Sequence, residues 1–116
     1  MNKYQQQVLE DLNLNIFNNS NKQNKNYFER TQHLIKTITE LDIISKYDLT
    51  EDNLSVERIS DSSLGVYFNL RKNTKLIIIA KETEYIIFYK QTMRDDWQKV
   101  YVENLPELKY SIEQFL

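Results

Sequence analysis

The residues that could carry out catalysis are few in this sequence. His33 is the only histidine and cysteine is absent, so a nucleophile activated by imidazole would need His33 beside a serine. No serine stands in a strand–turn–helix elbow with flanking glycines, because Gly65 is the only glycine. The same lack of glycine excludes the loops that wrap a phosphate with backbone N–H groups. Gly65 itself is expected to mark a bulge or a close backbone approach within a strand.

Acidic residues are numerous, but their spacing does not suit a metal site. Neighbouring carboxylates diverge by about 100° on a helix and point to opposite faces of a strand, so adjacent pairs do not converge on one ion or one proton. The adjacent pairs are Glu10 with Asp11, Glu51 with Asp52, and Asp95 with Asp96. We therefore expect a protein that is not an enzyme and binds no metal or cofactor.

The charge of the chain is nearly balanced overall and uneven along its length. The net charge is −2, so no global positive field attracts nucleic acid or anionic lipid. The segment from Asp42 to Asp61 carries six acids against Lys46 and Arg58, whereas Arg71 to Lys81 holds four bases and no acid. These segments suit a partner with complementary patches, or they simply solvate connections between elements.

The sequence offers no signal for export or for a membrane. The first fifteen residues alternate apolar with polar side chains, and the longest apolar run is Leu76 to Ala80, far shorter than the ~20 residues that span a bilayer. Without cysteine the chain also suits a reducing compartment. We expect a cytoplasmic protein.

The N-terminal part has the periodicity of two helices. Apolar residues four apart predict an amphipathic helix from about Lys3 to Phe17, followed by a polar linker from Asn18 to Asn26 that could let this helix move independently. Because a lone helix is marginal in water, we expect it to pack on the rest. Asn26, with Glu29 three residues later, is expected to cap a second helix that ends near Ser45 to Tyr47.

After Asp48 the apolar period changes from nearly four to two, which is typical of strands. Short turns at 61–63, 71–74 and 82–83, and a polar tip at 92–96, leave room only for antiparallel connections. Asn104 then caps a last helix with Pro106 in its first turn. The prediction is one α+β domain over residues 1–116: an antiparallel meander of four or five strands with two N-terminal helices and one C-terminal helix packed on it.

The alternation gives the predicted sheet two apolar faces. We expect one set of residues to face the helices: Leu64, Val66, Phe68, Leu70, Leu76, Ile78, Ile86, Phe88, Val100 and Val102. The other set then points away from them: Tyr67, Ile77, Ile79, Tyr85, Ile87, Tyr89, Trp97 and Tyr101. Such an aromatic face exceeds what soluble monomers normally expose, so a helix of this chain, a second copy or another protein should cover it.

The predicted function is that of a non-catalytic protein-binding module. Its surface would combine the aromatic face with charged hairpin tips. The aromatic candidates are Tyr67, Tyr85, Tyr89, Trp97 and Tyr101, and the charged candidates are Arg71, Lys72, Arg94, Asp95 and Asp96. Tyrosine and tryptophan suit this role because each offers broad apolar contact and a polar atom. An inhibitor, an immunity protein, an anti-defence protein or an escort chaperone could work in this way, and a homodimer is the other form of docking.

The alternative is binding of single-stranded nucleic acid, in which the same aromatic side chains stack on bases. Lysines near them would hold the phosphates: Lys75, Lys81, Lys90 and Lys99. The sequence pI of about 5.4 and the lack of the glycine–aromatic signature of RNA-recognition sheets argue against this alternative.

Overall fold

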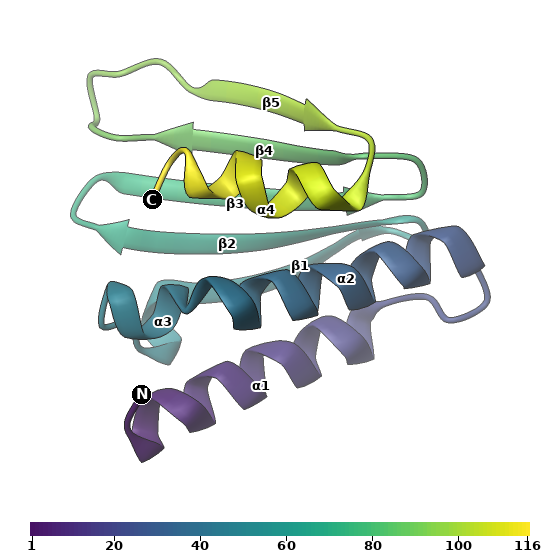
Figure 1. Ribbon diagram of the computed structural model, residues 1–116, viewed down its shortest axis with the longest axis horizontal. Coiled ribbons are helices and arrows are strands. Elements are labelled where there is room, and N and C mark those ends of the chain that lie inside the picture. Colours follow the sequence, from purple (N-terminus) through teal and green to yellow (C-terminus); the bar gives the residue numbers. More distant parts are fainter.

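Four α-helices and one antiparallel sheet make up the computed structural model, which describes residues 1–116 (Figure 1). The helices are α1 (Lys3–Asn19), α2 (Lys25–Leu41), α3 (Ile43–Lys46) and α4 (Leu105–Glu113), and a 3₁₀ turn, η1, spans Glu51–Asn53. The strands are β1 (Leu54–Ser60), β2 (Ser63–Arg71), β3 (Thr74–Lys81), β4 (Tyr85–Lys90) and β5 (Gln98–Val102). None of the helices combines the length and the apolar content that crossing a lipid bilayer requires.

The strands follow one another across the sheet in chain order, β1-β2-β3-β4-β5, and every neighbouring pair is antiparallel. The predicted α+β class and the meander are confirmed. Figure 1 shows α1, α2 and α4 side by side on one face of the sheet. One core joins the two layers: Ile16, Leu34 and Ile38 of the helices are almost fully buried with Val66, Phe68 and Ile78 of the sheet. The three long helices therefore cover a single face.

The second helix begins and ends earlier than its predicted bounds. Asn24 is the N-cap, since its side chain accepts the Tyr27 N–H at 3.3 Å, so the prediction of Asn26 as the cap is wrong. Both residues are asparagines with the same capping chemistry, and the helix begins at Lys25, directly after Asn24. Asp42, with φ 54°, lies in the left-handed region and ends α2 before the short α3 begins. This break lets Ile43 and Ile44 enter the core.

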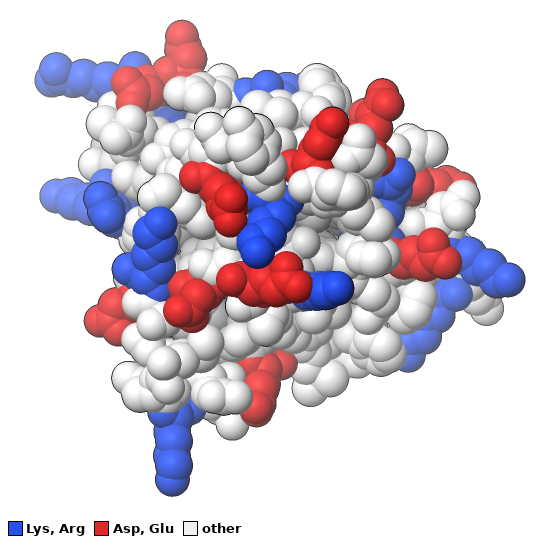
Figure 2. All heavy atoms as spheres, viewed as in Figure 1, with Lys and Arg blue, Asp and Glu red and all other residues white.

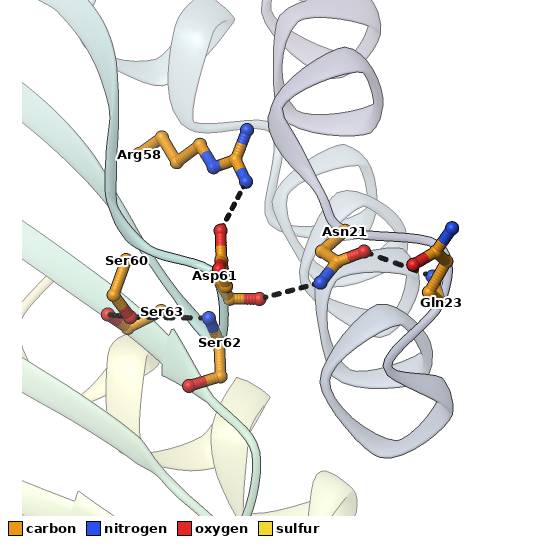
Figure 3. Close-up of polar contacts among 7 residues, drawn as sticks. All are labelled: Asn21, Gln23, Arg58, Ser60, Asp61, Ser62 and Ser63. Carbon is orange, nitrogen blue, oxygen red and sulfur yellow. Dashed lines mark hydrogen bonds and ion pairs between the residues drawn. The ribbon is translucent and has the colours of Figure 1, made fainter.

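The connection between α1 and α2 is held against the sheet, as Figure 3 shows. The Asn21 side chain donates to the Asp61 carbonyl in the β1–β2 turn at 3.2 Å and also accepts the Gln23 N–H at 3.1 Å. Val8, Leu12 and Ile16 bury the inner side of α1. The prediction that α1 packs within the fold is confirmed.

Candidate docking surface

The face of the sheet opposite the helices carries a continuous apolar surface. No helix covers it, and we call it the open face. Its apolar residues are Tyr67, Ile77, Ile79, Ile86, Phe88, Trp97 and Tyr101. Residues directly opposite one another in antiparallel strands point to the same side, so the pairs Tyr67 with Ile77 and Ile77 with Phe88 form a row across β2, β3 and β4.

The centre of the open face is a depression of about 370 Å³ that is lined only by hydrophobic side chains. The lining residues are Tyr67, Ile77, Ile79, Phe88 and Trp97. The two isoleucines of β3 lie between aromatic side chains from β2 and β4 and from Trp97, the residue that precedes β5. An apolar side chain of another molecule is the natural occupant of such a depression.

The prediction that Tyr85, Ile87 and Tyr89 lie on this face is wrong. Tyr85 and Ile87 are fully buried on the helix side, and the Tyr89 ring stacks on Phe115 with centroids 4.7 Å apart. The Tyr85 hydroxyl donates to the Arg30 carbonyl at 2.7 Å, which satisfies it within the core. Burial raises the pKa of Tyr85 well above its usual value.

Ile86 and Phe88 take the places on the open face that the sequence pattern assigned to the helix side. Both alternations within β4 are apolar, so its periodicity alone cannot decide which set faces the core. The tight turn after Lys81 does decide it. Lys81 N–H donates to the Glu84 carbonyl, and the pairing that follows places Ile86 opposite Ile79 and Phe88 opposite Ile77.

Gly65 allows the Tyr67 ring to lie flat across the sheet. An ideal Cβ at Gly65 would lie 2.8 Å from Cε2 of Tyr67, so any larger residue meets the ring. From this position the Tyr67 hydroxyl donates to the Glu57 carboxylate at 2.8 Å. Burial, reinforced by this hydrogen bond, raises the pKa of Tyr67. The prediction of a bulge or a close backbone approach at Gly65 is wrong, because the group that approaches is the side-chain ring of Tyr67, which lines the depression.

Trp97 and Tyr101 remain accessible beside this depression, with 42% and 55% of their surface exposed. Trp97 meets Phe88 edge to face, with centroids 6.4 Å apart and ring planes at 88°. Lysine ammonium groups lie over these rings. Lys99 Nζ is 4.8 Å from the Tyr101 centroid and 5.4 Å from that of Phe88, and Lys90 Nζ is 5.7 Å from that of Trp97.

The two hairpin tips with predicted site residues lie at the same end of the sheet as Trp97 (Figure 1). Thr74 Oγ1 donates to the Gln91 carbonyl at 2.8 Å and joins the two connections. Lys72, Arg94, Asp95 and Asp96 are exposed there. Arg71 turns toward the helix side, where its guanidinium lies 5.2 Å from the Tyr47 ring centroid. A register shift between Asn69 and Arg71 causes this change of side.

His33 lies far from the open face, on an outer part of α2 beside a cavity of about 620 Å³. Arg30 borders the same cavity, and its guanidinium bonds to backbone carbonyls. Nε donates to the Glu82 carbonyl at 3.0 Å and Nη2 donates to the Glu103 carbonyl at 2.9 Å. The serines of the β1–β2 turn bond to one another, with Ser60 and Ser63 Oγ atoms 2.8 Å apart (Figure 3). Histidine and serine thus form no nucleophilic pair at this turn.

The acids between Asp42 and Asp61 are distributed over several structural contacts. Asp61 pairs with Arg58 at 2.5 Å, Asp48 accepts the Gln5 side-chain amide at 3.0 Å, and Glu51 accepts the Tyr4 hydroxyl. The hydrogen bond from Tyr4 lowers the pKa of Glu51. On the helix side of the molecule, acidic and basic side chains are interspersed, as Figure 2 shows.

The open face therefore combines a depression lined only by hydrophobic side chains with lysine side chains that lie beside its aromatic rings. No three His, Asp or Glu side chains stand close enough together to hold a metal ion. Comparison with protein-family models, with curated proteins and with solved structures finds no match to this chain.

Proposed function

We propose that this protein is a non-catalytic module that binds another protein through the open face and the neighbouring hairpin tips. The observation that carries the proposal is the uncovered row of Tyr67, Ile77 and Phe88 with its apolar depression. A contiguous apolar patch rimmed by polar groups marks an interaction site in soluble proteins. An inhibitor, an immunity protein or an anti-defence protein of the cytoplasm would act by blocking its target with this surface.

The side chains at this surface are those that contribute most to protein interfaces. Large aromatic residues in the centre of an interface supply most of its binding free energy, and surrounding contacts exclude water. Trp97 packs on the Phe88 ring and Tyr101 lies beside Lys99, and such contacts reduce the side-chain entropy that is lost on docking. The sheet is a rigid support on which the surface forms before the partner arrives.

Affinity capture with variants of the open face tests this proposal. Wild-type protein, the double variant Phe88→Ala with Trp97→Ala, and the control Tyr110→Ala are each used as bait in native lysate. Tyr110 is 64% exposed on α4, so the control removes an exposed aromatic side chain from the opposite side of the sheet. We expect the wild type and the control to capture a protein that the double variant does not capture. Circular dichroism verifies that all three baits are folded. Identical captured proteins for all baits would contradict the proposal.

A second candidate function, binding of single-stranded nucleic acid, draws support from the lysines beside the aromatic rings. Lys90 and Lys99 lie against Trp97, Phe88 and Tyr101. This combination resembles the aromatic and basic surfaces that hold bases and phosphates. Gel-shift titration with mixed oligonucleotides separates the candidates, because affinity for nucleic acid falls steeply between low and moderate salt.

A further inference from the structure

Positive charge is concentrated on the open face of this acidic protein. Four lysines of the strands point to the same side as Ile77, Phe88 and Tyr101, namely Lys75, Lys81, Lys90 and Lys99. Glu57 is the one acidic residue of the strands on that side, and its carboxylate accepts a hydrogen bond from the Tyr67 hydroxyl. Other acids, Glu84, Asp95 and Asp96, lie in the turns at the two ends of the sheet. Lys75 Nζ donates to the Asn69 side-chain oxygen at 2.6 Å, and none of the four lysines forms an ion pair with a carboxylate. The middle of the open face thus combines apolar groups with ammonium groups that no acid neutralises.

The placement of the lysines favours a protein over a nucleic acid. Lys99 lies over the faces of Tyr101 and Phe88, and Trp97 stands at 88° to Phe88, so these rings offer no common platform for stacked bases. The floor of the depression includes Ile77 and Ile79, which suit an aliphatic or aromatic side chain. The lysines around this depression can then pair with carboxylates that flank the inserted side chain.

A second copy of the chain fits the open face less well. Symmetric pairing of two identical faces brings the same patch of each copy together. The lysines beside the apolar depression of one copy would then approach the lysines of the other copy. Like charges that lose water on contact disfavour such a pair.

We infer that the partner of the open face is an acidic protein segment that inserts an apolar side chain between Tyr67, Ile77 and Phe88. Carboxylates on either side of this residue pair with the ammonium groups of Lys90 and Lys99. This inference rests on the proposed function and adds the chemistry of the partner.

Selection from a displayed random dodecapeptide library on the immobilised full-length protein tests the inference. We expect enrichment of sequences with Leu, Ile, Phe or Trp flanked by Asp or Glu. Synthetic peptides free of tryptophan are then titrated while the fluorescence of Trp97 is followed, since Trp97 is the only tryptophan and lies on the open face. Lys99→Glu should weaken binding by about tenfold, and Lys36→Glu, the same change on the exposed outer side of α2, should leave it unchanged.

Four results of the peptide experiments would overturn the inference. They are a library that yields no enriched sequence, enriched peptides that are basic or uncharged, equal affinities for Lys99→Glu and Lys36→Glu, and tighter binding of oligothymidylate than of any selected peptide. Sedimentation equilibrium showing a dimer that Phe88→Ala dissociates would identify a second copy as the occupant and also contradict it. Should capture still depend on Phe88 and Trp97 while Lys99→Glu has no effect, the proposed function stands and only the acidic partner is wrong.

Discussion

Replacement of Gly65 by alanine tests how the open face is built. The new Cβ would lie 2.8 Å from Cε2, 3.0 Å from Oη and 3.1 Å from Cζ of Tyr67, whereas non-bonded carbon atoms prefer separations of about 3.5 to 4.0 Å. The ring must therefore rotate away from the strand. The Tyr67 hydroxyl then leaves Glu57, with which it now forms a hydrogen bond of 2.8 Å.

Two opposing effects set the change in the free energy of unfolding. Loss of a hydrogen bond costs about 1 kcal/mol, and alanine in place of glycine within a strand contributes about 0.5 to 1 kcal/mol of stability. We expect Gly65→Ala to change the stability of the wild type little. In a Tyr67→Val background, where no ring is present, the same substitution should stabilise by about 0.5 to 1 kcal/mol. The coupling between the two positions is then about 1 kcal/mol.

Urea unfolding of the four proteins of this cycle, followed by far-UV circular dichroism, measures the coupling. A third background, Tyr67→Phe, keeps the ring but lacks the hydroxyl, so it separates steric overlap from loss of the hydrogen bond. The reasoning is refuted when Gly65→Ala has the same effect in the Tyr67→Val and wild-type backgrounds within about 0.3 kcal/mol.

The buried side of the sheet gives further predictions. Tyr85→Phe should destabilise the protein by about 1 kcal/mol, because it removes the hydrogen bond to the Arg30 carbonyl. Tyr27→Phe should be neutral or stabilising, because the buried Tyr27 hydroxyl has no hydrogen-bond partner. Chemical unfolding of the two variants measures both effects. Burial raises the pKa of both tyrosines, so their contribution to stability should be constant below the unfolded-state value of about 10 and fall as pH rises above it. Tyr85→Phe should reduce that alkaline slope by up to about 1.4 kcal/mol per pH unit, and an unchanged slope would contradict the assignment. Arg30→Met should lower hydrogen-exchange protection near Glu82 and Glu103, since both carbonyls lose a guanidinium donor; unchanged protection would show that these bonds do not hold the turns.

The fold class could be predicted because periodicity changes clearly along the chain. Helical spacing places Val8, Leu12 and Ile16 on one buried side of α1, and alternation places Val66 and Phe68 under the helices. The short turns allow only antiparallel neighbours, so the meander follows from the positions of the turns. The caps were predictable only where one candidate was present: Asn104 caps α4, whereas Asn24 and Asn26 both had the right chemistry for α2.

Part of the open face could also have been predicted correctly with a closer use of the turns. A two-residue turn at Glu82 and Thr83 pairs Lys81 with Glu84, and this register places Ile86 opposite Ile79. The apolar period of β4 placed Ile86 on the helix side instead, because both alternate sets of residues in this strand are apolar. The turn geometry was the stronger signal.

Other features of the site depend on contacts that no sequence pattern encodes. Lys99 lies over Tyr101 and Phe88, and the Tyr67 ring lies over Gly65, because of the rotamers that the Lys99 and Tyr67 side chains adopt. The hydrogen bond from Tyr85 to the Arg30 carbonyl joins residues that are 55 positions apart. Such contacts follow from tertiary packing and become visible only in three dimensions.

Site-specific photo-crosslinking in intact cells tests most directly whether the open face docks on a protein. A benzophenone amino acid replaces Trp97 in one variant and Tyr110, exposed on α4, in the control. The account predicts an adduct from position 97 that protease removes and nuclease does not, and no such adduct from position 110. Adducts of equal yield from both positions, or an adduct at position 97 that nuclease removes, would contradict it.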